Sequence, residues 1–114
     1  MNTRFLFIVL SLMAVFSQPV HASNNAAERG KARAQAQCAA CHAKNGDWNQ
    51  PLDASYPKLS GQHKDYLTQA LQQYRDGRRK NAIMAAQAKG LSDQDIDELS
   101  SFFGSLKGDL YIKK

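Results

Sequence analysis

Cys38-Ala39-Ala40-Cys41-His42 is the most specific pattern in this chain of 114 residues. Two thiols three positions apart, followed directly by an imidazole, form the attachment pattern of c-type haem. Each thiol adds to one vinyl group, so the two sulfur atoms lie along one edge of the porphyrin. His42 then lies under the iron, where its imidazole can be the proximal ligand. The motif therefore predicts one covalent haem c with its iron, held by Cys38, Cys41 and His42.

The same cysteines could also form a redox dithiol or half of a zinc site. A redox pair needs no histidine after it and is typical of a βαβ setting, which this sequence lacks. Zinc needs further Cys or His ligands, and beyond the motif residues 23–114 offer only His63. The pattern favours haem over both alternatives.

Residues 1–22 have the layout of a secretory signal peptide. Arg4 precedes a run of twelve apolar or small residues from Phe5 to Phe16, and Val20 and Ala22 suit a cleavage site. Such a run makes a helix of only about 18 Å, too short for a hydrocarbon core of about 30 Å. We therefore expect cleavage after Ala22, export to the periplasm and no stable membrane insertion. An uncleaved anchor is the competing interpretation.

Residues 23–114 leave room for one small domain, for which a haem would supply the missing apolar centre. The whole chain has 15 Lys and Arg against 10 Asp and Glu, and loss of Arg4 would leave a net charge of +4. This excess is too small and too scattered to indicate nucleic-acid binding.

The pattern of residues 23–114 predicts helices and no useful strand. Capping and termination signals place them at 26–37 after Asn25, at about 63–76 before Gly77, and from Ser92 to a stop at Gly108. Residues 45–60 read as a loop that could wrap a haem, with Trp48 either against the haem or in ordinary packing.

The second axial position of the iron has three candidate states. Met84 is the only methionine outside residues 1–22, and it lies between two expected helices. His63 would instead give a bis-histidine site, and an open position would allow small-ligand chemistry. The residues alone leave these alternatives open.

The chain resembles class I c-type cytochromes, most closely the cytochrome c4 and c553 group of bacterial periplasmic electron carriers. The resemblance covers nearly all of residues 23–114. It rests on Ala27-x-x-Gly30-Lys31, CAACH at 38–42, YPKLSGQ at 56–62, Tyr66-Leu67, Arg75 with Gly77, Met84, and LSDQDI at 91–96. It implies an all-α, small class I cytochrome c fold whose helices and loops wrap one covalently attached haem, in a cytochrome c domain over residues 23–114.

The resemblance also implies roles for single residues. Met84 would be the second axial ligand, and the Pro57 carbonyl would accept a hydrogen bond from the proximal imidazole. Gly30 would pack against Phe102 or Phe103. Ala82 stands where this group commonly has proline, so the distal segment is expected to be less stiff.

The implied function is a one-electron carrier of the respiratory chain, not an enzyme, and a monomer. Its partners would be redox proteins, either membrane respiratory complexes or periplasmic reductases. Two alternatives remain: a haem subunit of a larger dehydrogenase, or peroxide or small-ligand chemistry at a labile sixth position. A basic cluster could dock partners or only solvate a helix end; its members are Arg75, Arg78, Arg79 and Lys80.

Overall fold

A computed structural model of the chain describes residues 25–110. The expected signal peptide and its cleavage site therefore lie outside the described residues. The described part contains no strand and has five helices: α1 (Ala26–Gln37), α2 (Ala39–His42), α3 (Lys64–Arg75), α4 (Ala82–Ala88) and α5 (Asp93–Ser105). This confirms the all-α prediction. None of these helices is long and apolar enough to cross a membrane.

The helix starts follow from local capping chemistry. The Asn25 side chain accepts a hydrogen bond from the Ala27 N–H at the start of α1. Ser92 and Asp95 form a reciprocal capping box at the start of α5. Such caps satisfy backbone donors that have no partner within the helix. After the C-terminal end of α3, Gly77 adopts the left-handed conformation that stops a helix, with a φ of +77°.

Two helix boundaries differ from the expectation. Helix α5 ends at Ser105, and Leu106 is already extended, so Gly108 is not the helix stop. Gly108 instead lies so close to the 43–63 loop that an added Cβ would be 2.2 Å from Asn49 Oδ1. Met84, expected between helices, lies within the short helix α4.

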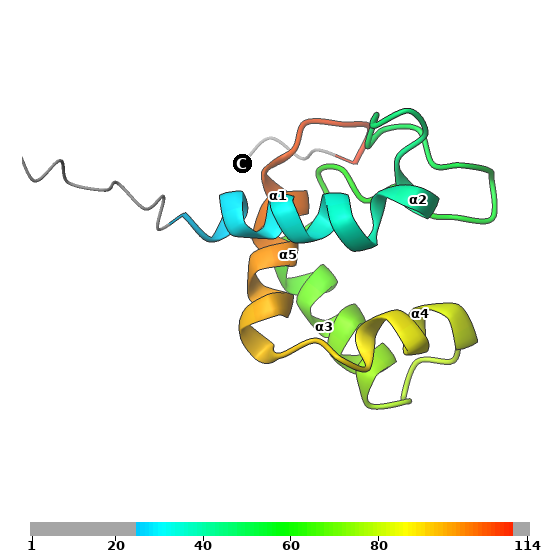
Figure 1. Cartoon of the computed structure of the whole chain (residues 1–114), viewed down its shortest axis with the longest axis vertical. Helices are drawn as coiled ribbons and strands as arrows, with labels where there is room; N and C mark the ends of the chain where they lie inside the picture. Colours follow the sequence, from blue (N-terminus) through cyan, green and yellow to red (C-terminus); the bar gives the residue numbers. More distant parts are fainter. Residues whose placement is uncertain (1–24, 111–114) are drawn as a thin grey trace, which may run out of the picture.

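The core forms where α1 crosses α5 (Figure 1). Gly30 permits this crossing, because a Cβ built on it would lie 1.9 Å from the carbonyl oxygen of Glu98. The atoms nearest to this added Cβ belong to the α5 backbone at Glu98 and Leu99, and the expected packing against Phe102 or Phe103 stays a prediction. The fully or nearly fully buried apolar side chains of this region are Ala34, Leu67, Ala88, Leu91, Ile96, Leu99, Phe102 and Phe103.

Residues 43–63 form a long loop between α2 and α3, as expected for most of this range. Trp48 anchors the loop to α5, with its ring centroid 5.7 Å from that of Phe102 and 5.1 Å from that of Phe103, both edge-on. Edge-on aromatic pairs are favourable beyond their buried area. The structure thus places Trp48 in aromatic packing against the last helix.

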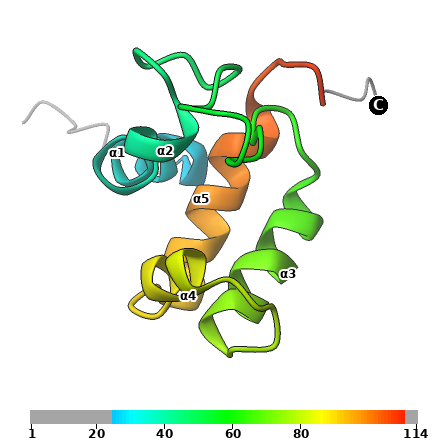
Figure 2. The ribbon, with the colours of Figure 1, turned by 90° about the vertical axis from the view of Figure 1, so that its right-hand side faces the viewer.

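Helices α2 and α4 lie on the same side of α5, one above the other, in both views of the ribbon (Figures 1 and 2). Helix α2 ends with His42, and α4 carries Met84. The fold therefore brings together two elements that are forty residues apart in sequence, and both carry candidate iron ligands.

Candidate haem site

The cysteines of the motif lie where α1 meets α2. Cys38 closes α1 and directly precedes α2, and Cys41 lies within α2. Both thiols are free and partly buried. Burial raises the pKa of the Cys38 thiol to about 11, against a smaller opposing effect of Arg33. A redox-active dithiol requires a lowered thiol pKa, so this environment argues against the redox alternative.

The zinc alternative also lacks support. Among residues 25–110, no group of three or more His, Cys, Asp or Glu side chains could hold a metal ion. His63 lies at the N-terminus of α3 with an exposed side chain. A structural zinc site needs four such ligands, and the described residues do not assemble them.

His42 is buried, with 6% of its surface exposed. Its Nδ1 lies 2.9 Å from the carbonyl oxygen of Pro57. Because a carbonyl oxygen can only accept, Nδ1 must carry a proton, and in the neutral ring the lone pair is then on Nε2. The Pro57 contact therefore fixes both the ring orientation and the tautomer that a metal ligand requires.

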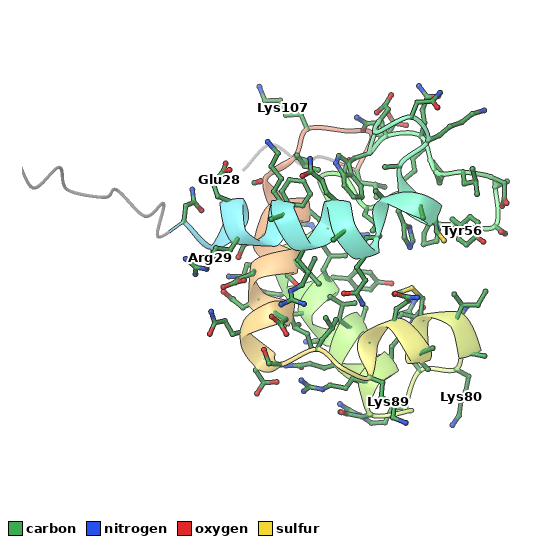
Figure 3. All side chains as sticks on the ribbon, in the orientation of Figure 1. Glu28, Arg29, Tyr56, Lys80, Lys89 and Lys107 are labelled. Atoms are coloured by element: carbon green, nitrogen blue, oxygen red, sulfur yellow. The ribbon has the colours of Figure 1, made fainter. Side chains whose placement is uncertain are left out.

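Tyr56, which directly precedes Pro57, packs against the same imidazole. Its ring centroid lies 6.0 Å from that of His42 in an edge-on arrangement. Figure 3 shows its side chain extending from the loop beside α2, on the side that faces α4. The sequence motif that contains Tyr56 does not predict this contact, because the neighbours of a loop residue depend on how the loop folds.

Met84 is half-buried in the first turn of α4, and its N–H donates to Asn81 Oδ1 at 3.0 Å. Asn81 is thus the N-cap of the helix that carries the methionine. The signal for this cap was present in the sequence as an asparagine three residues before Met84. The cap is hard to recognise from the sequence because the helix that follows it has only seven residues.

One contact joins α4 to the helix that leads into the motif. The Gln37 side-chain nitrogen donates to the Gln87 carbonyl oxygen at 2.8 Å. Gln37 directly precedes Cys38, and Gln87 lies three residues after Met84. This hydrogen bond holds the C-terminal end of α4 close to the cysteine-bearing end of α1.

The basic cluster separates into internal and outward-facing members. Arg75 donates to the Leu91 carbonyl oxygen at 3.1 Å and pairs with Asp93 at 2.8 Å. Arg79 donates to the hydroxyls of two α3 residues, Tyr66 and Tyr74.

The other two members of the cluster face outward. Arg78 is largely exposed and pairs with Asp76. Lys80 lies just before the start of α4 and points away from the chain (Figure 3).

These residues fit a covalently attached haem. The thiols are free, the buried imidazole uses Nδ1 for Pro57 and leaves Nε2 for a metal, and a thioether lies on the neighbouring helix α4. Sulfur and imidazole nitrogen are the donors that haem iron takes in electron-transfer proteins. Cys38, Cys41, His42 and Met84 are thus the residues that would hold the group.

Comparison with known proteins adds an independent observation. Residues 27–107 match the sequence profile of the family described as cytochrome c. A similar protein is cytochrome c-554(548) of Halomonas halodenitrificans, 41% identical over 71 residues, which are 60% of this chain and 82% of the relative.

Longer relatives match over part of their length. Cytochrome c4 of Pseudomonas aeruginosa is 35% identical over 102 residues, which are 90% of this chain and 48% of the relative. A protein of Thiomonas intermedia named thiosulfate dehydrogenase electron acceptor is 39% identical over 72 residues, covering 63% of this chain and 32% of the relative. The chain thus spans half or less of these two proteins.

Proposed function

Because the chain belongs to the cytochrome c family, we propose that it is a periplasmic one-electron carrier built on a single haem c. Covalently attached haem c with its iron is the cofactor of this family, and electron transfer is the function it supports. The observation that carries the proposal is the hydrogen bond between His42 and Pro57, which prepares a buried imidazole as a ligand directly after two free thiols.

Each site residue has a proposed role. Cys38 and Cys41 form the two thioethers, and His42 and Met84 are the axial ligands. When bound, the haem supplies an iron that alternates between the ferric and ferrous states. The soft sulfur of Met84 favours the ferrous state and raises the reduction potential relative to a bis-histidine site. Pro57 keeps the His42 ring fixed during the exchange.

The composition of α4 supports a carrier over an enzyme that acts on small ligands. Such an enzyme needs an open axial position and usually a group that moves protons beside it. Helix α4 reads AIMAAQA and has no ionisable side chain, and its one metal-binding group is the Met84 thioether. A sixth position filled from a helix that carries no acid or base suits electron transfer better than peroxide chemistry.

The partners are proposed as redox proteins at the periplasmic side of the membrane. The similarity to a thiosulfate dehydrogenase electron acceptor supports a dehydrogenase as one donor class. The leader pattern at residues 1–22 supports export and cleavage, after which the chain would act as a monomer. A fixed haem subunit of a larger dehydrogenase is the second candidate.

Carbon monoxide and native size test the proposal together. The reduced carrier should keep its spectrum when carbon monoxide is added, because Met84 occupies the sixth position. Immediate formation of a carbon monoxide adduct in the wild type would favour small-ligand chemistry. Co-purification with a larger dehydrogenase under native conditions would favour the subunit alternative.

A further inference from the structure

Arg79 is held between two tyrosines of α3. Its Nε donates to the Tyr74 hydroxyl at 2.9 Å and its Nη2 to the Tyr66 hydroxyl at 3.3 Å. The guanidinium carbon also lies 5.1 Å from the Tyr74 ring centroid and 5.8 Å from that of Tyr66. A guanidinium within about 6 Å of a ring centroid makes a favourable cation–π contact. The three side chains, Tyr66, Tyr74 and Arg79, are called the tyrosine clamp below.

The clamp fixes the connection between α3 and α4. The backbone N–H of Arg79 donates to the Gln73 carbonyl oxygen at 3.0 Å, so the turn folds back onto α3. Two residues later, Asn81 caps α4 through the N–H of Met84. Arg79 is therefore held against α3 two residues before the N-cap of α4.

Burial does little to hold the first two residues of α4 in place. Ala82 and Ile83 are exposed, Ile83 by 58%, and the only fully buried residue of α4 is Ala88 at its far end. Beside Ala82 and Ala85 the surface is hollowed over about 320 Å³, bordered by Arg79 itself. The segment also lacks a proline that would stiffen it, since position 82 is alanine.

We propose that Arg79 is a positioning residue for Met84, which acts by clamping the start of α4 to Tyr66 and Tyr74. The inference rests on the proposed role of Met84 as an axial ligand. A planar guanidinium can donate to both hydroxyls at once, which a lysine ammonium on a flexible stem does less well. The clamp keeps the Met84 segment from opening away from the haem side.

The test compares Arg79→Gln with Arg78→Gln in the haem-loaded protein. Arg78 is the matched control, because it is 64% exposed and makes one ion pair with Asp76 in the same turn. Two readouts report directly on Met84: the weak far-red sulfur-to-iron band of the ferric protein, and the rate at which carbon monoxide binds the reduced protein. Loss of two hydrogen bonds and a cation–π contact should weaken the band and speed carbon monoxide binding by about tenfold.

If Arg79→Gln cannot be produced as a folded protein, two further variants test the same inference. Tyr74→Phe removes one hydroxyl and keeps the ring, so it should speed carbon monoxide binding to a smaller extent. Arg79→Lys keeps the charge and should fall between the wild type and Arg79→Gln. A thermal unfolding midpoint for each variant separates general destabilisation from opening at Met84.

The outcomes are distinguishable. If Arg79→Gln and Tyr74→Phe keep the wild-type band and the wild-type carbon monoxide rate, the clamp does not position Met84 and the inference is wrong. If the wild type itself lacks the band and binds carbon monoxide at once, Met84 is not the ligand and the proposed function fails with it. A band that weakens only in the clamp variants supports the inference.

Discussion

The Nδ1 atom of His42 lies 2.9 Å from the carbonyl oxygen of Pro57, fifteen residues further along the chain. This contact couples the last residue of the short helix α2 to the loop that follows it. The imidazole is buried, with 6% exposure, and its Nδ1 is engaged by Pro57, which leaves Nε2 as the nitrogen that can serve as a ligand. The loop is thus part of the candidate site and not merely a connection, because it decides which nitrogen is available.

The cysteines predict covalent attachment. In the wild type, the haem should remain with the polypeptide through denaturation and extraction with acidified acetone, because a thioether does not depend on iron ligation. The Cys38→Ala, Cys41→Ala double variant should release it. Each single variant is a control that should keep the haem through one bond, with a shifted absorption spectrum. Free extraction of haem from the wild type would contradict the assignment.

We expect Gly30→Ala to change the stability of the fold in the direction opposite to that expected from helix propensity alone. In an isolated helix, glycine to alanine stabilises by about 1 kcal/mol. Here the added Cβ would lie 1.9 Å from the Glu98 carbonyl oxygen, so α1 and α5 must move apart. We expect Gly30→Ala to destabilise by about 2–3 kcal/mol, as in overpacked cores.

Denaturant unfolding of the haem-loaded protein measures the effect of Gly30→Ala. Ala32→Gly, at an exposed position of the same helix, is the control for propensity and should cost about 1 kcal/mol. A Gly30→Ala variant as stable as the wild type would mean that the two helices cross at a greater distance.

Much of the fold follows from local signals. Ser92 with Asp95, Asn25 and Gly77 mark helix ends through contacts within a few residues, so the sequence predicts α1, α3 and the start of α5 correctly. Cys38 and His42 are predicted as haem-binding residues because the haem itself dictates their spacing.

The remainder depends on tertiary contacts that no local pattern contains. Helix α4 has only seven residues, and such short helices gain their stability from neighbours. Gly30 meets the α5 backbone near Glu98 because of how the helices cross, which residue types alone do not determine. The pairing of Arg79 with two tyrosines likewise requires the turn that precedes α4 to fold back onto α3.

Glu98 predicts a pH-dependent contribution to stability. It is buried on α5, and hydrogen bonds from Arg29 at 2.5 Å and Gln94 at 2.8 Å lower the pKa of its carboxyl group. A carboxyl group with a lowered folded-state pKa stabilises the fold above its unfolded pKa of about 4.3. This stabilisation is lost as the pH falls through the folded value.

Glu98→Gln should therefore lower the unfolding midpoint at pH 7, and its difference from the wild type should shrink in acid. Asp97→Asn is the control, because its ion pair with Lys64 is exposed, at 53% and 46% of the side chains, and such pairs contribute little. Thermal unfolding at neutral and acidic pH measures both. A Glu98→Gln deficit that is equally large in acid would show that the carboxylate charge is not the cause.

Lys80 predicts a local charge effect on electron transfer. Arg75 and Arg79 are engaged within the chain, whereas Lys80 is exposed beside α4. Ferricyanide is a small anionic oxidant, so its reaction with the reduced protein should be fastest at low salt and slow as screening rises. Lys80→Glu should slow this reaction at low salt more than a reversal placed far from α4.

Lys107→Glu is the matched control, since Lys107 lies beyond the end of α5 and on the opposite side of the molecule from Lys80 (Figure 3). Stopped-flow oxidation over a salt series compares the two variants. Equal slowing by both would mean that only net charge matters, and that the surface next to α4 is not where electrons leave.

The ligation of the iron is the central claim, and the ferric absorption spectrum of the wild type beside Met84→Ala tests it most directly. We expect the weak far-red band of a sulfur–iron bond in the wild type and its complete loss in Met84→Ala, whose reduced form should then bind carbon monoxide. His63→Ala is the control and should keep the band. A band that persists in Met84→Ala, or a wild type that lacks it and shows low-spin bis-histidine signals, would contradict the account.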